Sequence, residues 1–406
     1  MGLFLHFGVN TFTDREWGLG NEPESVFNPT ALDARQWARA AKAGGFRRMI
    51  LTAKHHDGFC LWPSAVTSHS VKSSPWRGGQ GDVVREFVTA ARAEGLEPGL
   101  YLSPWDRHEP SYGDSARYND FYCTQLTELL TRYGPLVEIW FDGANGEGPN
   151  GRKQTYDWDR YHRLIRRHQP EALIFSDAGP DIRWVGNEDG SAGDPNWCPV
   201  NPAVVPYPGA GGDAVTAELQ HGDPHGSVWR PAEADVSIRP GWFWHPAEDA
   251  KVKTPDQLLD LYLSSVGRNA GLLLNVPPNR TGLLADGDVA SLSAFGALRH
   301  RWFGANLAAN GSVNATATRV SLDLQTLETF DLIVIRESIT HGQRVERFTV
   351  EGDEGSRWRA LATGTTIGAK RIIRIQPFTT NGIQIRLEST LGAPRISEVA
   401  LYRSPV

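Results

Sequence analysis

Cysteine is scarce in this chain of 406 residues, which contains only three. Cys60, Cys123 and Cys198 cannot all pair with one another, and their spacing matches no metal-binding pattern. The sequence therefore indicates neither a disulfide framework nor a cysteine-based metal site. We expect each thiol to be a small buried or half-buried side chain.

Several other signals are missing as well. The chain has no apolar run of membrane-spanning length, no Walker loop, no glycine-rich dinucleotide motif and no internal repeat. Its net charge is −6, and no basic patch is large enough to suggest binding to nucleic acid. We therefore expect neither nucleic acid nor a membrane among its partners.

The N-terminal residues bear on localisation. An apolar run begins at Gly2, which leaves no room for a cleavable signal peptide ahead of the predicted fold. Two expectations remain open: a cytoplasmic protein, or a periplasmic or secreted protein whose leader is removed.

What the chain does contain is enough apolar material for a full core. Hydrophobic residues make up 40% of it and charged residues 22%, so the chain is not disordered. Its length predicts roughly two to three domains. Fourteen tryptophans against ten tyrosines is unusual. Tryptophan suits stacking on sugar rings, although burial in a core is its ordinary structural role.

Polar residues follow several apolar, strand-like runs at the point where each run ends. Residues 3–8 reach His6, residues 48–58 reach His55 and His56, and residues 137–143 reach Asp142. In a barrel of parallel strands, the carboxyl ends of the strands meet at the mouth where active sites are built. We therefore expect one shared pocket. Further runs that end in polar or aromatic residues reach Ser103, Trp105, Asp177, Glu188 and Asn275. An isolated Asp-Gly pair would more often be a helix cap or a turn.

Helix-like stretches lie between these runs. Apolar residues recur at helical spacing over residues 29–45, 81–95, 115–134, 157–168 and 254–267. Strands that alternate with helices predict an α/β protein with a parallel sheet covered by helices. About 300 residues of this pattern fit a TIM-like (β/α) barrel over residues 1–305 better than an open sheet. Fewer than eight clear helices predict that some are short, irregular or missing.

The pattern of alternating strand-like and helix-like segments ends after Asn275. Residues 288–301 predict one closing helix, and residues 306–406 form a second domain of short β-like segments. Seven or eight such segments divided by turns predict an antiparallel β-sandwich. Such a domain could bind sugar or support the barrel, and the lack of a cluster of exposed aromatics in its sequence favours the supporting role.

Several motifs resemble one known family when they are taken together. Residues 5–8 (LHFG), 14–18 (DREWG), 54–59 (KHHDGF) and 140–143 (WFDG), with residues 183–188, 235–242 and 272–278, are similar to the signature segments of glycoside hydrolase family 29, the retaining α-L-fucosidases. The resemblance covers residues 1–305, and the C-terminal sandwich is similar to that of the family. The segments at 186–188 and 239–242 look more like the subfamily that acts on α-1,3/1,4-linked fucose than like the broad-specificity subfamily, which is the alternative.

The resemblance implies roles for individual residues. Retaining glycosidases use one carboxylate as nucleophile and a second carboxyl as acid and base. Asp142 matches the family nucleophile, Glu188 is the candidate acid/base and Glu233 is the alternative to Glu188. The other positions implied to bind the substrate are His6, Glu16, Trp17, His55 and His56 on the sugar hydroxyls, Tyr101 and Trp140 against the ring, and Glu233 and Trp242 near the rest of the glycan.

Two other classes of function remain as alternatives. His6, His55, His56 and Asp57 could mimic the ligands of a metal-dependent barrel hydrolase, but the first strand lacks a His-x-His pair and no bridging lysine is evident. A sugar-binding protein without turnover is disfavoured by the two intact carboxylates. We expect no metal and no cofactor, and a fucosylated oligosaccharide or glycoconjugate as the substrate; the sequence leaves the oligomeric state open.

Overall fold

Eight short, buried segments form parallel strands that close into a barrel in the computed structural model, which describes residues 1–405. The strands, in their order around the barrel, are β1 (Gly2–Leu5), β10 (Gly271–Asn275), β9 (Ala232–Ser237), β6 (Ile182–Trp184), β5 (Leu173–Ser176), β4 (Glu138–Trp140), β3 (Glu97–Leu102) and β2 (Arg48–Lys54). The runs of β1 and β10 are almost continuously apolar, and β2 is buried along nearly its whole length, because helices or the barrel interior cover both faces of these strands. The predicted parallel barrel is confirmed.

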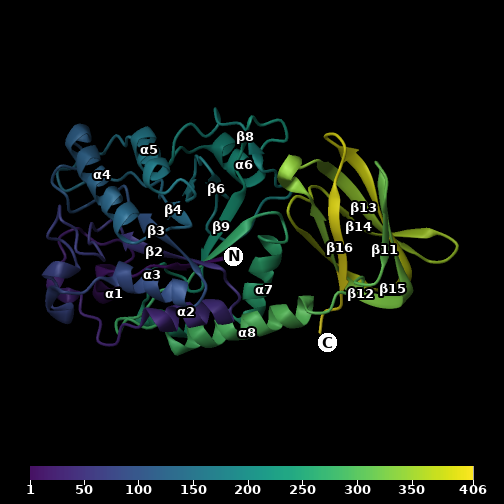
Figure 1. Cartoon of the computed structure of the whole chain (residues 1–406), viewed down its shortest axis with the longest axis horizontal. Coiled ribbons are helices and arrows are strands. Elements are labelled where there is room, and N and C mark those ends of the chain that lie inside the picture. The colour runs from purple at the N-terminus through teal and green to yellow at the C-terminus, as the bar shows by residue number, and fades with distance from the viewer. Residues whose placement is uncertain (406) are drawn as a thin grey trace.

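Helices surround this barrel on its outside (Figure 1). The longer ones are α2 (Ala34–Ala43), α3 (Val83–Ala93), α4 (Ser115–Arg132), α5 (Trp158–His168), α6 (Asp213–His221), α7 (Pro255–Ser264) and α8 (Asp286–Phe303). Four of them, α2 to α5, begin at an aspartate whose carboxylate accepts a backbone N–H of the first turn, and Thr254 caps α7. Each such cap stabilises its helix by about 1 kcal/mol. The predicted start of α2 at residue 29 was wrong, because the cap is Asp33 rather than the Asn-Pro-Thr sequence before it.

Shorter elements fill the connections at both ends of the barrel. They are α1 (Val9–Thr13), the 3-10 helices η1 (Glu24–Val26), η2 (Val71–Ser73), η3 (Trp76–Gly79) and η4 (Pro246–Lys251), and the two-stranded sheet of β7 (Pro199–Val200) and β8 (Val228–Trp229). Residues 177–181, all of them described, join β5 to β6 without a helix. Among residues 1–405, no helix combines the length and the apolar character needed to cross a membrane.

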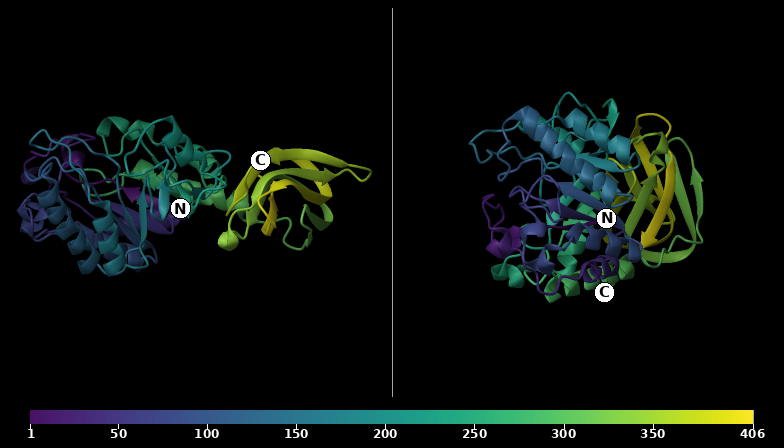
Figure 2. Two further views of the ribbon diagram at one scale, coloured as in Figure 1. Left: turned by 90° about the horizontal axis from the view of Figure 1, so that it is seen from above. Right: turned by 60° about the vertical axis from the view of Figure 1, so that its left-hand side comes forward.

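The C-terminal strands form one antiparallel sheet of six strands around its own apolar core. They are β11 (Ser312–Ala315), β12 (Arg319–Glu337), β13 (Val345–Asp353), β14 (Trp358–Gly364), β15 (Arg371–Thr390) and β16 (Ile396–Tyr402), with the 3-10 helix η5 (Ile339–His341) after β12. Figure 2 shows this sheet packed beside the barrel. The predicted antiparallel β-structure is confirmed, but the expected number of strands was wrong.

Two long strands, β12 and β15, explain why the sequence predicts more strands than the sheet has. The sequence predicts separate strands at 319–324 and 331–336, whereas β12 runs through both segments. Its pairing with β15 shifts register between Asp323 and Glu328 and again between Phe330 and Leu332, and Gln325 lies in the left-handed region with φ 67°. A bulge of this kind interrupts the apolar pattern without ending the strand. The same irregularity divides β15 into two apparent segments.

Candidate active site

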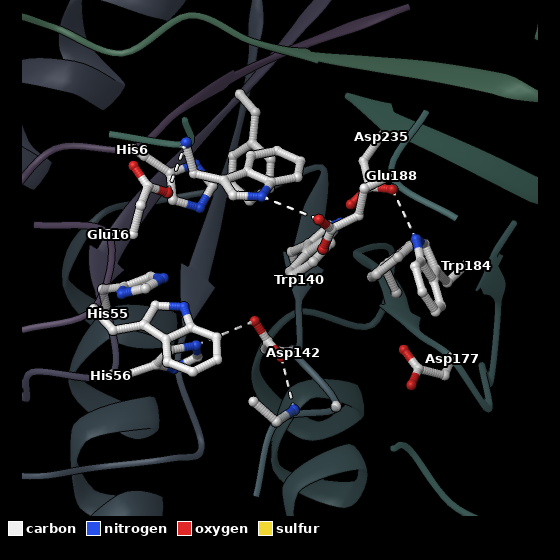
Figure 3. Close-up of a pocket in the computed structure, with 16 residues that line it drawn as sticks. His6, Glu16, His55, His56, Trp140, Asp142, Asp177, Trp184, Glu188 and Asp235 are labelled. Atoms are coloured by element: carbon white, nitrogen blue, oxygen red, sulfur yellow. Dashed lines mark hydrogen bonds and ion pairs between the residues drawn. The ribbon is translucent and has the colours of Figure 1, made fainter. Parts of the chain in front are cut away.

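A cavity of about 300 Å³ lies at the carboxyl ends of the barrel strands. It is lined by residues that the sequence singled out and by several that it did not, and Figure 3 shows the side chains. The lining residues are Phe4, His6, Glu16, Trp17, His55, His56, Trp140, Asp142, Gly143, Ala144, Phe175, Asp177, Trp184, Glu188, Asp235 and Trp242. The structure therefore brings nine of the eleven predicted site residues into one cavity; Tyr101 and Glu233 are the exceptions.

Asp142 follows β4 by two residues, and both of its oxygens are held. The hydroxyl of Tyr101 donates to Oδ2 at 3.1 Å, and the backbone N–H of Ala144 donates to Oδ1 at 2.7 Å. His56 Nε2 lies 3.7 Å from Oδ2. The bond to Ala144 is the turn contact typical of an isolated Asp-Gly pair, yet the side chain remains 29% exposed toward the cavity. Asp142 thus makes a turn and also presents a fixed carboxylate to a bound molecule.

Tyr101 does not line the cavity, so the expectation that it packs against a substrate was wrong. It is fully buried on β3 inside the barrel, beside Phe4 and Trp140. Burial raises the pKa of the Tyr101 phenol well above its usual value, and the charge of Asp142 raises it further. Tyr101 therefore stays protonated and acts as a hydrogen-bond donor to Asp142.

The first of the cavity histidines, His6, follows β1. Its Nδ1 lies 2.8 Å from Asn275 Oδ1. The amide nitrogen of Asn275 donates to Ser237 Oγ and to the Trp242 carbonyl, which fixes Oδ1 as the acceptor. His6 Nδ1 must therefore carry the proton, and Nε2 of the neutral ring keeps a free lone pair.

His56 has the same tautomer. Its Nδ1 lies 2.8 Å from Ser103 Oγ, and that hydroxyl already donates its own proton to the Trp105 carbonyl. Nδ1 is therefore the donor and Nε2, which lies beside Asp142, is an acceptor.

His55 has the opposite arrangement. Its Nδ1 faces the amide nitrogen of Asn10 at 3.5 Å, and the same nitrogen donates to the Glu16 carbonyl. Nδ1 of His55 thus faces a donor, so Nε2 carries the proton. Burial lowers the pKa of all three rings, to about 3 for His6, well below the usual value for His55, and to a smaller extent for His56. The cavity therefore offers two neutral imidazole acceptors and one donor.

Glu16 joins two loops at the rim of the cavity. Its carboxylate accepts the backbone N–H groups of Trp242 at 2.8 Å and Phe243 at 3.1 Å, and it lies 2.6 Å from His245 Nε2. Trp17, which is 60% exposed, packs edge-on against Trp105. Both residues therefore stand at the rim, where they can contact a bound molecule.

Glu188 lies on the exposed rim, four residues after β6. Trp242 Nε1 donates to its Oε2 at 3.3 Å. Partial burial raises the pKa of Glu188, and the negative charges of Asp142, Glu16 and Asp189 raise it further, against the opposing hydrogen bond from Trp242. A carboxyl with a raised pKa can hold a proton closer to neutral pH, which is what a general acid requires.

Two further carboxyl groups line the cavity, although the sequence argument assigned them no role. Asp235 is buried on β9, and its Oδ1 accepts the indole N–H of Trp184 at 2.7 Å. Burial raises the pKa of Asp235 well above its usual value, and the charge of Glu188 adds to this. Asp177 accepts the Gly209 N–H at 2.8 Å, and burial raises its pKa to about 6. Asp177 could have been found from the sequence because it follows an apolar run. For Asp235 the only signal was its place in the family-like segment 235–242.

Glu233 lies outside the cavity, so its assignment to the substrate site was wrong. It is the second residue of β9, at the amino end of the barrel, and it forms an ion pair with Arg48, the first residue of β2. Arg48 also pairs with Glu138 at 2.9 Å. The amino end of a parallel barrel is opposite the face that carries active sites. Glu233 therefore belongs to a buried charge cluster that closes the other end of the barrel.

The positions of the carboxylates and imidazoles also bear on metal binding. Within residues 1–405, no group of three or more histidine, cysteine, aspartate or glutamate side chains is arranged to hold a metal ion. The imidazole Nδ1 atoms of His6, His55 and His56 are all engaged by neighbouring protein groups. The geometry suits hydrogen bonding to a polyhydroxylated molecule.

Comparisons with known proteins agree with one another. The family model described as alpha-L-fucosidase matches residues 1–306. The chain is 44% identical to Alpha-L-fucosidase 1 of Arabidopsis thaliana, over 99% of this chain and 85% of that protein. It is also similar to the crystal structure of a glycoside hydrolase 29 family member from an unknown rumen bacterium, with a TM-score of 0.93 and 40% identity over 100% of this chain and 75% of that one. A Ruminococcus gnavus family 29 fucosidase in complex with fucose has a TM-score of 0.89 and 33% identity, over 100% of this chain and 92% of that one.

Proposed function

Because this chain belongs to the α-L-fucosidase family, glycoside hydrolase family 29, and is an α-L-fucosidase, we propose that it removes terminal α-L-fucose with retention of configuration. The observation that carries the proposal is that Asp142 and Glu188 line the same cavity as three neutral histidines. A retaining glycosidase needs two carboxyl groups with different roles on either side of the bond that breaks.

The reaction would proceed in two displacements. The Asp142 carboxylate attacks the anomeric carbon of fucose while the glycosidic bond breaks, and Glu188 gives its proton to the departing oxygen. The resulting fucosyl ester of Asp142 is then attacked by water, and Glu188 accepts the proton of that water. Asp142 suits the first role because Tyr101 and Ala144 hold it in one orientation. Glu188 suits the second because its pKa is raised.

The histidines would hold the hydroxyl groups of fucose. The free Nε2 atoms of His6 and His56 accept hydrogen bonds, and the protonated Nε2 of His55 donates one. Trp140, packed face to face on Phe175, gives the cavity an apolar wall for the ring and its methyl group. This mixture of an apolar wall with a few fixed polar groups is typical of a sugar site.

We expect His56→Ala to lower kcat/KM for an aryl α-L-fucoside by about 10- to 100-fold. Losing a hydrogen bond to a buried hydroxyl costs roughly 1–3 kcal/mol. Steady-state kinetics of His56→Ala and His6→Ala would measure the loss, and His300→Ala, an exposed change in the last turn of α8, is the matched control. Treatment with EDTA should leave the wild type unchanged. Loss of activity with EDTA and its recovery with zinc would support a metal-dependent hydrolase instead.

The proposed substrate is a branched glycan with α-1,3- or α-1,4-linked fucose. Figure 3 shows Trp184, Asp177 and Asp235 on the opposite side of the cavity from the histidines. An indole flanked by two carboxyl groups offers stacking and hydrogen bonds to a second sugar. Those groups, with the sequence resemblance at 186–188 and 239–242, support the α-1,3/1,4 assignment over broad specificity.

A substrate panel tests the linkage. It contains an aryl α-L-fucoside, a 2-linked fucosyl disaccharide and branched trisaccharides with 3- or 4-linked fucose. We expect kcat/KM to be at least about tenfold higher for the branched trisaccharides than for the 2-linked sugar, the effect of about 1.4 kcal/mol of extra contact in the transition state. Released fucose is measured directly. Efficient cleavage of the 2-linked sugar would overturn the linkage proposal and leave the fucosidase assignment intact.

A further inference from the structure

The loop that carries Glu188 leads directly into a segment held by the C-terminal sheet. The loop is closed on itself by Asn187, whose Nδ2 donates to the Ser191 carbonyl at 2.9 Å and whose Oδ1 accepts the Asp189 N–H at 3.0 Å. Residues 189–193 are all that separate Glu188 from Asp194. The loop is held on the barrel side by bonds of Ala192 with Ser264 and Arg268, at 3.0 and 3.1 Å, and residues 194–198 hold the end by which the chain leaves it. Displacement of residues 194–198 would therefore shift this short loop and Glu188 with it.

Side chains from loops between strands of the C-terminal sheet bind the backbone of this segment. The Asn196 N–H donates to Thr366 Oγ1 at 3.1 Å, and the Cys198 N–H donates to Gln343 Oε1 at 3.0 Å. Gln343 Nε2 in turn donates to the Asn196 carbonyl at 3.0 Å. Asn196, Gln343 and Thr366 are all at least 96% buried. A buried hydrogen-bonded network has one favourable arrangement, because displacement leaves its groups unpaired.

An ion pair fixes the start of the same segment. Arg371, the first residue of β15, donates from both Nη atoms to Asp194, at 2.9 Å to Oδ1 and 2.6 Å to Oδ2, and Thr365 also donates to this carboxylate. Two parallel bonds from a guanidinium fix orientation as well as distance. We refer to the bonds of Gln343, Thr366 and Arg371 to residues 194–198 as the interdomain contact.

The interdomain contact also reaches the other end of the Glu188 loop. Asn196 Oδ1 accepts Arg183 Nη2 at 2.8 Å, and Arg183 is a buried residue of β6 next to Trp184. Asn196 Nδ2 donates to the Arg268 carbonyl at 2.9 Å. The strand that enters the loop and the segment that leaves it therefore converge on one residue, and that residue is held by the C-terminal sheet.

Glu337 fixes the two loops of the C-terminal sheet that carry Gln343 and Thr366. Glu337, buried at the end of β12, accepts the N–H groups of Arg344 and Val345 on one oxygen and that of Gly368 on the other. These bonds tie the segment after Gln343 to the segment after Thr366. Figure 1 shows this end of the sheet beside α6 and beside β8 of the small two-stranded sheet.

From this arrangement we propose that Gln343, Thr366 and Arg371 are positioning residues for proton transfer, which act by holding the Glu188 loop at the rim of the active site. The proposal rests on the assignment of Glu188 as acid/base under the proposed function. It gives the C-terminal sheet a part in the reaction that differs from general support of the barrel.

Leaving-group dependence separates this role from a merely structural one. We compare kcat/KM, which reports only the first displacement, for phenyl α-L-fucoside and 2-chloro-4-nitrophenyl α-L-fucoside. The phenyl group needs protonation to depart, whereas the chloronitrophenyl group does not. In Gln343→Ala and Arg371→Ala, we expect kcat/KM for the phenyl fucoside to fall about 10- to 100-fold, the effect of displacing the acid by roughly 1 Å. For the chloronitrophenyl fucoside, kcat/KM should fall no more than about threefold. The alkaline limb of the pH profile should also move.

Two further variants make the comparison selective. Lys370→Met removes an interdomain hydrogen bond to Tyr262 on α7, at 2.7 Å, that does not involve the Glu188 loop, so it should leave the ratio of the two substrates unchanged. Arg371→Lys keeps the charge and should recover part of the loss. Thermal unfolding of each variant reports stability independently. The Asp194–Arg371 pair is partly exposed, so the Arg371 variants test the proposal even where the buried Gln343 change prevents folding.

Each outcome has one reading when Glu188→Gln is measured in parallel. A selective loss on the phenyl substrate in the Gln343 and Arg371 variants, absent from Lys370→Met, supports the proposal. Parallel losses on both substrates, or no loss, overturn it while Glu188→Gln still discriminates between the leaving groups. If Glu188→Gln itself does not discriminate, the assignment of Glu188 fails, and the positioning proposal fails with it.

Discussion

Replacement of Asp142 by alanine or glycine is expected to lower kcat for every fucoside on the order of 10⁴-fold or more, because the first displacement then lacks its nucleophile. The fold should survive. Asp142 is partly exposed, and its loss removes the bonds with Tyr101 and Ala144 and the contact with His56. The unpaired Tyr101 hydroxyl would cost roughly 1–3 kcal/mol of stability. Steady-state kinetics and thermal unfolding measure the two effects separately, with Asp159→Ala on the exposed first turn of α5 as the control.

Azide distinguishes a missing nucleophile from other causes of inactivity. In Asp142→Gly, a small anion can enter the space left by the carboxylate and attack the anomeric carbon of an activated aryl fucoside. The aryl alcohol leaves, and the expected product is β-L-fucosyl azide, inverted relative to the substrate. Rescue with this stereochemistry supports covalent catalysis by Asp142. Wild-type-like activity in the variant would remove Asp142 from the role, and an α-linked azide would contradict the proposed direction of attack.

The positions of Asp142 and the histidines were predictable because each follows a strongly apolar run. In β1, β2 and β4 such runs are easily recognised, and the carboxyl ends of parallel strands must meet at one face. The sequence therefore located His6, His55, His56 and Asp142 in one cavity without any knowledge of pairing. It could not reveal the hydrogen bonds that set the tautomers, since Asn275 is distant in sequence from His6.

Glu233 and Tyr101 were misplaced for two different physical reasons. The segment of β9, Ala-Glu-Ala-Asp-Val-Ser, contains little of the β-branched and aromatic content that marks a strand, so the sequence did not indicate which end of the barrel Glu233 occupies, and Glu233 was expected near the glycan. The pairing of β9 with β6 and β10 makes it a strand and places Glu233 at the far end of the barrel. For Tyr101, the predicted strand was correct but the predicted contact with the sugar was not. The depth of a side chain inside a barrel depends on the stagger of neighbouring strands, which the sequence of one strand does not show.

The fold also sets the electrostatics of the cavity. Asp142, Asp177, Glu188 and Asp235 come from four different strand ends and meet only in the folded barrel. Burial raises the pKa values of Asp177, Glu188 and Asp235 to different extents, and the charges of neighbouring carboxylates raise them further. Separation of the pKa values of neighbouring carboxyl groups is how one site obtains both an ionised nucleophile and a protonated acid at one pH. The sequence supplied the groups, and the fold determines which of them can hold a proton.

Glu188→Gln is expected to discriminate strongly between leaving groups. A sugar leaves as an alkoxide unless it is protonated, so kcat/KM for a fucosylated glycan should fall about 10²- to 10⁴-fold. A 2-chloro-4-nitrophenyl group leaves readily without help, so kcat/KM for that fucoside should fall less than about tenfold. The two rates, measured on one enzyme preparation, give the ratio directly. Glu171→Gln, an exposed change just before β5 at the opposite end of the barrel, is the matched control and should leave the ratio unchanged.

The pH profile provides an independent check on the same residue. The general acid is active only while protonated, so activity should fall as the pH rises through the pKa of Glu188. Because that pKa is raised, the alkaline limb should lie above the range of an ordinary glutamate, and it should disappear in Glu188→Gln. Equal losses on both substrates with an unchanged limb would remove Glu188 from the role. Asp235 would then be the first candidate, since its carboxyl lies beside Glu188 with a raised pKa of its own, and Asp235→Asn should show the leaving-group dependence that Glu188→Gln lacks.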